Sequence, residues 1–357
     1  MALVEERMKG CKVTLLPIER VSAWYCALTS VLMVVMMPRL ADPVEMLLTR
    51  VEWLALTAAV IALSHYLTHS PRTKDLQCTI FNSKLSTLNS QLFIRVLAQM
   101  AWLPRWYPDT YEFNRTLPNL DHLFAAYEQS LFGCQPSIEF SQALPGALWS
   151  EAFNLGYFSY FPMIAVLVIT IFILESRNPS TLNRPPWGTT GGPSTINPQL
   201  STFNTVAAII QTAFYLYYLI YIFVPVTGPQ FYFQAVGIDE ILQGHFPALG
   251  TYFSSHTEML PAPGWTDGLF NHLVAMAHEA GERPTAAFPS SHIGISTIVM
   301  MLAYRHATRI LPYLLPLWGL LCCATVYIQA HYVIDAIAGL LTAPLALYLS
   351  TLLSRKL

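Results

Sequence analysis

Residues 285–297 read TAAFPSSHIGIST and place a proline, two serines and a histidine directly before an apolar run. Pro289 suits the first turn of a helix, where its missing N–H costs nothing. The N–H groups of Ser290, Ser291 and His292 are then expected to be free at the helix N-terminus, where the helix dipole favours anions. The two hydroxyls add donors, and His292 is placed to protonate a leaving oxygen. The stretch therefore predicts a phosphate site at the start of a helix.

The composition places this helix in a membrane. Of the 357 residues, 54% are hydrophobic and 11% are charged, whereas soluble domains carry about 25% charged residues. Apolar runs of about 20 residues are long enough to cross a bilayer core of about 30 Å. The sequence predicts an all-α, polytopic transmembrane helix bundle of about eight spans with a six-helix catalytic core. The predicted spans are 21–38, 48–67, 91–104, 153–174, 203–226, 289–305, 311–329 and 333–353.

The segment 91–104 is the least regular of these spans, because it is short and contains Arg95. An interfacial position is the alternative for it. If it does span the membrane, 14 of the 19 Lys and Arg residues fall on one side. Positive charge gathers on the cytoplasmic side of membrane proteins, so both termini are expected to be cytoplasmic.

The same topology organises the rest of the chain. Residues 1–104 are predicted to form N-terminal transmembrane segments, and residues 105–357 a catalytic transmembrane domain. The segments 105–150 and 227–288 are expected to form caps on the non-cytoplasmic face. No basic patch suggests nucleic-acid binding.

A second polar stretch, AHYVIDAIAG at residues 330–339, is expected on the same face as His292. The spans 289–305 and 311–329 form a helical hairpin, so the chain returns to the side from which it started. His331 and Asp335 are four residues apart and share a face of a helix. The carboxylate of Asp335 can accept a hydrogen bond from one imidazole nitrogen of His331 and leave the other nitrogen free as a nucleophile.

FPSSH and HYVIDAIAG together resemble the second and third motifs of the type 2 phosphatidic acid phosphatase superfamily. That superfamily includes lipid phosphate phosphatases, undecaprenyl diphosphate phosphatases and vanadium haloperoxidases. The resemblance implies that His331 forms a phosphohistidine, that Asp335 holds it, and that His292 is the general acid.

A wider resemblance rests on three further stretches: LDHLFAAYEQSLFGCQPS (120–137), EAFNLGYFSYFP (151–162) and YYLIYIFVPVTGPQF (217–231). These are similar to the membrane-embedded branch that contains the fungal inositol phosphorylceramide synthases. In that branch a span ending in a turn with Pro and Gly precedes the catalytic hairpin.

The cation that should clamp the phosphate is harder to place. The superfamily's first motif is Lys, six residues and then Arg-Pro, and Arg177 with Arg184-Pro185 fits this spacing. The predicted topology puts that loop on the opposite, cytoplasmic face, so we interpret the match as accidental. The resembling branch often has Arg after Gly-Pro, but this chain has Gln230 there.

Arg283 is the one basic residue of the segment 227–288 and lies nine residues before His292. We therefore predict a phosphate-binding set of Arg283, Ser290, Ser291 and Gln230. The alternative for Arg283 is a surface cation paired with Glu279 or Glu282.

No metal or other cofactor is predicted. The same segment holds four further histidines, but none has a tight metal-ligand spacing with its neighbours. Scattered solvent-exposed polar positions are therefore expected for these side chains, which are His245, His256, His272 and His278.

Taken together, the residues and the resemblance predict an integral-membrane lipid phosphate phosphatase that acts through a phosphohistidine at the non-cytoplasmic face. Its partners would be a lipid phosphate substrate and the bilayer. Transfer to a second alcohol, as in an inositol phosphorylceramide synthase, is the alternative. From a different class, a proton-coupled transporter could use an intramembrane His–Asp pair, but no inverted repeat supports it. The expected membrane is the plasma membrane in a bacterium or a Golgi-type membrane in a eukaryote.

Overall fold

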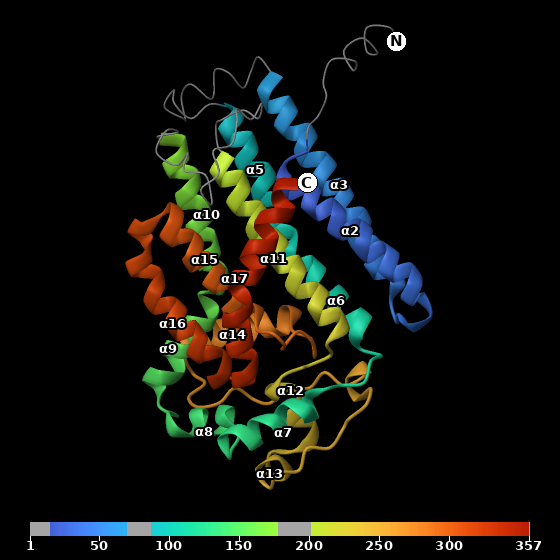
Figure 1. The fold of residues 1–357 in the computed structure, drawn as a ribbon, viewed down its shortest axis with the longest axis vertical. Helices are drawn as coiled ribbons and strands as arrows, with labels where there is room; N and C mark the ends of the chain where they lie inside the picture. The colour runs from blue at the N-terminus through green and yellow to red at the C-terminus, as the bar shows by residue number, and fades with distance from the viewer. Residues whose placement is uncertain (1–14, 70–86, 178–200, 357) are drawn as a thin grey trace.

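The computed structural model describes residues 15–69, 87–177 and 201–356 of the chain. Within these ranges every regular element is a helix (Figure 1). Six of the helical segments are long and apolar enough to cross a membrane. The predicted all-α polytopic bundle is therefore confirmed. The six segments are α2 (Pro17–Met36) with η1 (Met37–Arg39), α3 (Pro43–His69), α10 (Tyr160–Arg177), α11 (Ser201–Phe223), α16 (Leu311–Tyr327) with η4 (Thr308–Ile310), and α17 (Val333–Lys356).

The other two predicted spans correspond to shorter helices. They are α5 (Thr87–Trp102) and α15 (Ser291–His306), each of 16 residues. At 1.5 Å per residue such a helix is about 24 Å long, which is less than the bilayer core of about 30 Å. Both nevertheless lie inside the bundle, α5 against α3 and α15 against α16 and α17 (Figure 1).

Helix α11 is the centre of the bundle. In its most apolar window 78% of the residues are buried, against 22% to 44% in the other five spanning segments. It packs against α2, α10, α15 and α17, so its aromatic side chains other than the exposed Phe223 face protein. The outer helices instead expose apolar side chains such as Val34 and Val35 of α2, at 70% and 72%, as expected for surfaces that face lipid.

Buried ion pairs join the N-terminal helices to one another and to the helix α6 (Tyr107–Asn114). Arg50 of α3 pairs with Asp109 of α6 at 2.9 Å. Arg95 of α5 donates to Glu19 of α2, with 2.8 Å between Nε and Oε1. Each removes an isolated charge from the apolar bundle, where an unpaired charge is expensive. Arg95, which made its segment irregular as a span, is thus neutralised within the bundle.

Short helices cover one end of the bundle, which we call the cap end (Figure 1). The helices α15 and α17 both begin towards this end. The cap helices come from the two segments predicted as caps. From the first segment they are α7 (Asp121–Phe132) and α8 (Pro136–Ala143), and from the second α12 (Pro229–Val236), α13 (Ile238–Leu242) and α14 (Leu269–Gly281), with η3 (Tyr252–Ser254). The next helix, α9 (Ala147–Phe158), begins in the first segment and continues into the predicted span 153–174, which the structure divides between α9 and α10. The short η2 (Leu103–Trp106) joins α5 to α6.

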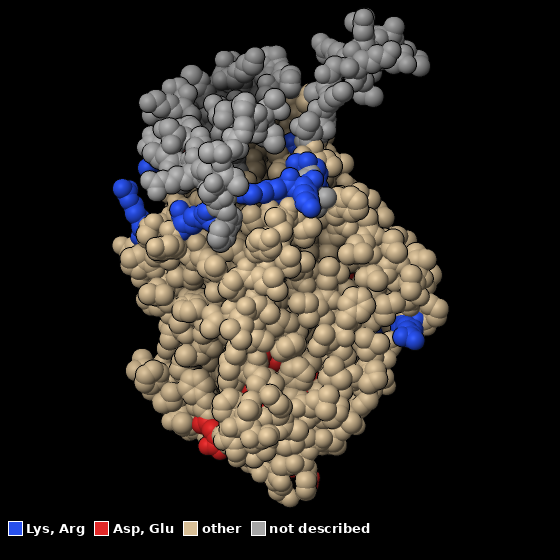
Figure 2. Space-filling model, in the orientation of Figure 1, with Lys and Arg blue, Asp and Glu red and all other residues tan. Residues whose placement is uncertain are grey.

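Basic side chains gather at the opposite end. Figure 2 shows Lys and Arg mainly there, and Asp and Glu in the half nearer the caps. Arg177, Arg305 and Lys356 lie in the last turns of α10, α15 and α17. This asymmetry agrees with the charge pattern of the sequence.

Candidate active site

The two histidines of the motifs meet at the cap end. His292 lies in the first turn of α15, and His331 lies in the turn between α16 and α17. The hairpin of α15, η4 and α16 returns the chain, so that His331 Nε2 lies 3.4 Å from His292 Nδ1. The ring centroids are 5.6 Å apart. His331 is 3% exposed, and His292 is partly buried.

A backbone carbonyl orients His331. Its Nδ1 donates to the carbonyl oxygen of Ala287 at 2.9 Å. Because a carbonyl only accepts, Nδ1 carries the proton, and in the neutral ring Nε2 keeps its lone pair on the side of His292. Burial lowers the pKa of His331 to about 4, so the ring is neutral at pH 7. Nε2 therefore carries the lone pair that a histidine nucleophile would use.

The predicted hydrogen bond from His331 to Asp335 is absent, which corrects the sequence-based expectation. Asp335 Oδ2 is 3.8 Å from Nδ1 and instead accepts from the N–H of Tyr332 at 2.9 Å. The sequence placed His331 and Asp335 on one continuous helix, but α17 begins at Val333. His331 thus lies outside the helix, and Asp335 holds the turn that carries it.

The FPSSH stretch also differs from the prediction. The helix α15 begins at Ser291, with Ser290 as the N-cap residue whose Oγ accepts from Ile293 N. Pro289 therefore precedes the helix instead of occupying its first turn. The Ser290 N–H donates to the carbonyl of Asp335 at 3.1 Å, and the Ser291 N–H donates to the Tyr221 hydroxyl at 2.9 Å.

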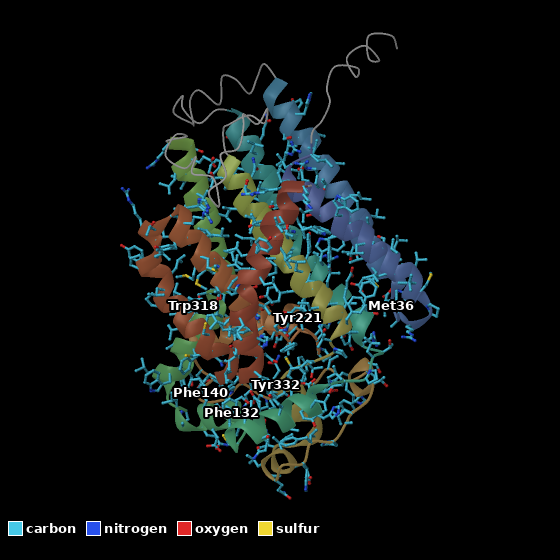
Figure 3. All side chains as sticks on the ribbon, in the orientation of Figure 1. Met36, Phe132, Phe140, Tyr221, Trp318 and Tyr332 are labelled. Carbon is cyan, nitrogen blue, oxygen red and sulfur yellow. The ribbon has the colours of Figure 1, made fainter. Side chains whose placement is uncertain are left out.

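Two of the three N–H groups predicted to be free are thus already used. The reason is that α11 and α17 close over this loop: Tyr221 also donates to the carbonyl of Pro289 at 2.9 Å. Among the described residues, none accepts from the N–H of His292. Figure 3 labels Tyr221 and Tyr332 in the lower half of the bundle, close to the cap helices.

Two tyrosines that the sequence did not single out enclose His292. Tyr157 of α9 stacks on its ring with 4.6 Å between centroids, and Tyr160 of α10 lies at 4.5 Å. Both are buried. Aromatic residues are common in membrane helices, so no signal in the sequence set these two apart.

The turn after α11 packs against the turn that carries His331. Gly228 has φ +93°, and a Cβ there would lie 2.4 Å from the carbonyl oxygen of Ala330. The next contact is Gln230 N, which donates to the carbonyl of Gln329 at 2.8 Å. Gln230 is therefore near the predicted site through its backbone. Within the described part of the chain its side chain makes no hydrogen bond.

Two buried carboxylates fix these turns, and neither was predicted. Asp121 accepts five hydrogen bonds, from Asn119, from Thr227 N and Oγ1, from Gly228 N and from the Tyr332 hydroxyl. Glu128 accepts from Ile334 N at the start of α17. Burial raises the pKa of Asp121 against the effect of its donors, and burial raises the pKa of Glu128 to about 7.

The predicted phosphate cation, Arg283, does not reach the histidines. Its guanidinium donates to the backbone carbonyl of Glu282 at 2.9 Å, and the structure shows it in no ion pair with Glu279 or Glu282. Within the described residues, neither His292 nor His331 is hydrogen-bonded or ion-paired to a Lys or Arg side chain. Arg177 ends α10, far from the caps (Figure 1), and Arg184 lies outside the described residues.

The prediction of solvent exposure holds for three of the four other histidines and is wrong for the fourth. His245, His256 and His272 are exposed. His278 of α14 turns inward and meets the Tyr157 ring edge-on, with 5.7 Å between centroids. Its Nε2 is buried and has no hydrogen-bond partner, and burial lowers the pKa of His278 to about 4. Within the described ranges no three His, Cys, Asp or Glu side chains are grouped to hold a metal.

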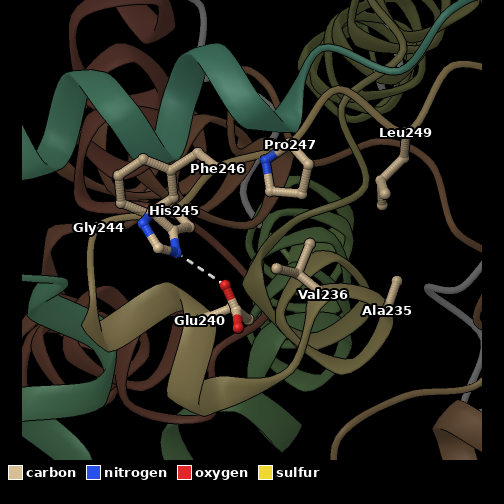
Figure 4. A pocket seen from close by; sticks show the side chains of 8 residues that line it. All are labelled: Ala235, Val236, Glu240, Gly244, His245, Phe246, Pro247 and Leu249. Carbon is tan, nitrogen blue, oxygen red and sulfur yellow. Dashed lines mark hydrogen bonds and ion pairs between the residues drawn. The ribbon is translucent and has the colours of Figure 1, made fainter.

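A hollow of about 570 Å³ lies elsewhere on the cap, beside α12 and α13 (Figure 4). The His245 imidazole and Glu240 carboxylate are hydrogen-bonded at its edge, 2.8 Å apart. Phe246, Pro247 and Leu249 supply apolar walls. None of the predicted site residues lines this hollow.

Comparison with known proteins gives one match. Residues 198–349 fit the family model of the PAP2 superfamily, and this range contains every predicted site residue. No curated protein and no solved structure matched the chain. This match supports an enzyme that acts on phosphate esters.

Proposed function

From the superfamily match and the histidine pair, we propose that the chain is an integral-membrane lipid phosphate phosphatase. The observation that carries the proposal is the arrangement of His331. Its Nδ1–H is fixed on Ala287, and its Nε2 faces His292 at 3.4 Å. A neutral imidazole with one nitrogen held and the other free is what a histidine nucleophile requires.

In the proposed reaction, Nε2 of His331 attacks the phosphorus while the bond from phosphorus to the alcohol oxygen breaks. In the same step His292 gives a proton to the departing alcohol and is left neutral. The phosphohistidine is then attacked by water, and neutral His292 takes the water proton as phosphate leaves. Asp335 contributes by holding the turn of His331 through Tyr332 N.

A phosphotransferase of the inositol phosphorylceramide synthase type is the second candidate, in which an alcohol replaces the water. A specific observation favours it. The three stretches that are similar to that branch supply Asp121, Tyr157, Tyr160, Tyr221 and Gly228, and all five contact the histidine motifs or their supporting turn. A proton-coupled transporter is less well supported, because the superfamily match points to phosphate chemistry.

We further propose that the cap end faces away from the cytoplasm and that both termini are cytoplasmic. The gathering of basic side chains at the opposite end supports this orientation (Figure 2). Under that orientation, substrate reaches the histidines from the non-cytoplasmic leaflet. A bacterial plasma membrane or a eukaryotic Golgi-type membrane would be the location.

The test is phosphate release from a panel of lipid phosphates by the detergent-purified chain in EDTA. Wild type is compared with His331→Ala, His292→Ala and, as a control, the exposed His245→Ala. Release should vanish in His331→Ala and fall by about 10² to 10⁴-fold in His292→Ala. Equal release by wild type and His331→Ala would refute the phosphohistidine. If wild type releases nothing, supplying phosphatidylinositol and a ceramide tests the transferase.

A further inference from the structure

His278 is a third histidine at the edge of the proposed site. It lies on the inner side of α14, and its ring meets Tyr157 at 5.7 Å. The other neighbour of Tyr157 is His292, stacked at 4.6 Å. One tyrosine ring therefore touches both histidines, and the electrostatic influence of His278 reaches His292.

The hydrogen bonding of His278 is incomplete. Its Nε2 is buried and has no partner. Buried polar atoms without partners are uncommon in folded proteins and call for a specific explanation. The backbone of His278 is satisfied, because its carbonyl accepts from Glu282 N at 2.8 Å. The buried unsatisfied atom of His278 is thus Nε2 of the ring.

The other histidines of this segment do not share this arrangement. His245 pairs with Glu240 at 2.8 Å, and His256 Nδ1 bonds the carbonyl of Tyr252 at 3.0 Å. His272 is six residues before His278 on the same helix and is exposed to solvent. Of these four histidines, His278 alone has a buried, unpartnered ring nitrogen.

The side chains around His278 are polar, as a site for a polar substrate requires. Glu282 follows one turn later and accepts from the Tyr107 hydroxyl at 3.3 Å. Tyr157 continues this polar group towards His292. Among the described residues no Lys or Arg is hydrogen-bonded or ion-paired to either motif histidine, so the imidazole of His278 is a candidate donor on this side for an oxygen of the substrate.

We propose that Nε2 of His278 hydrogen-bonds an oxygen of the phosphorylated substrate, either of the phosphate or of the alcohol joined to it. This rests on the proposed function, since it requires the substrate phosphorus to lie at His331. His278 is then a substrate-contacting residue of the same site. It lies on a cap helix to which the sequence motifs assign no role.

The test uses the full detergent-purified chain and three variants. His278→Phe keeps an aromatic ring against Tyr157 but removes the nitrogen. His278→Gln keeps a hydrogen-bonding atom at the same distance from the backbone. His272→Phe is the matched control on the exposed face of α14. We measure kcat and KM with the best lipid phosphate, and the thermal midpoint with and without inorganic phosphate.

The expected kcat/KM falls at least about ten-fold in His278→Phe, stays within about three-fold of wild type in His278→Gln, and stays within about two-fold in His272→Phe. Loss of the stabilisation by inorganic phosphate in His278→Phe assigns the contact to the phosphate. Retention of that stabilisation, together with the fall in kcat/KM, assigns the contact to the alcohol.

Two results would overturn the proposal: wild-type kcat/KM in His278→Phe, or an equal loss in His278→Phe and His278→Gln, which would indicate packing alone. Both differ from failure of the proposed function. The proposed function fails if wild type and His331→Ala have the same activity, or if wild type neither hydrolyses the lipid phosphate nor is stabilised by inorganic phosphate. The proposed role of His278 is then refuted as well.

Discussion

The contact between Gly228 and Ala330 allows a quantitative test of how the site is held. Gly228 has φ +93° and ψ 164°, a conformation that costs other residues about 1–3 kcal/mol. In Gly228→Ala the added Cβ would also lie 2.4 Å from the carbonyl oxygen of Ala330, whereas ordinary contacts begin at 3.4 Å. Overpacking of this kind adds about 1–3 kcal/mol.

Relief of this contact would move His331, the proposed nucleophile. To relieve the contact, the turn with Ala330 must move by about 1 Å, and His331 is the next residue. A misplacement of about 1 Å can cost about 10²-fold in rate. We therefore expect Gly228→Ala to lower kcat by about that factor, beyond what its loss of stability explains.

Gly237→Ala is the matched control. Gly237 has φ +96° and ψ 135°, close to the values of Gly228, but a Cβ there meets nothing within 4 Å. It should lower the thermal midpoint through backbone strain alone and leave kcat unchanged. The assay is thermal unfolding and phosphate release in the same detergent. Equal losses of kcat in the two variants would refute the idea that this turn positions His331.

Two further variants test other supports of the site. Tyr221→Phe leaves the Pro289 carbonyl and the Ser291 N–H without their partner, so thermal unfolding should show that the free energy of unfolding falls by about 1–3 kcal/mol. Tyr218→Phe is the control, because the Tyr218 hydroxyl has no hydrogen bond among the described residues. An equal loss in Tyr218→Phe would contradict the expectation. Burial raises the pKa of Glu128 to about 7, so the folded state binds an extra proton between pH 4.5 and 7 and the stability contributed by that proton is lost as pH rises. Glu128→Gln removes this dependence, and its thermal midpoint relative to wild type should be higher at pH 8 than at pH 5; no change between the two pH values would disagree.

The fold was largely predictable because a bilayer requires long apolar helices to cross it. Long apolar runs and the placement of Lys and Arg were enough for the helical bundle and for the six long segments. The lengths of α5 and α15 were not predictable from apolar runs alone. The first carries Arg95, which is tolerated because Glu19 of α2 pairs with it. The second begins after a loop that tertiary contacts hold.

The site was predictable only where residues are close in sequence or related by a helical hairpin. That reasoning paired His292 with His331. It failed for Asp335, because the start of α17 at Val333 depends on Glu128, which is more than 200 residues away along the chain. Similarly, the N–H groups of Ser290 and Ser291 are used by α17 and α11. The sequence did not distinguish His278 from the other polar residues of a long loop, because its contact with Tyr157 exists only in the folded cap.

The carboxylates around the histidines bear on the missing cation. Asp121, Glu128 and Asp335 each accept backbone N–H groups of the two turns, so their first role is to hold those turns. If all three were ionised, they would oppose a phosphate at His331, since like charges in a buried site repel strongly. Burial raises the pKa of Glu128 to about 7, so part of this negative charge is removed near neutral pH. If phosphate binds at His331 as proposed, protonation of this supporting carboxylate would reduce the repulsion at a site where no described Lys or Arg is hydrogen-bonded or ion-paired to the histidines, and neutral donors such as the proposed His278 would then contribute to binding.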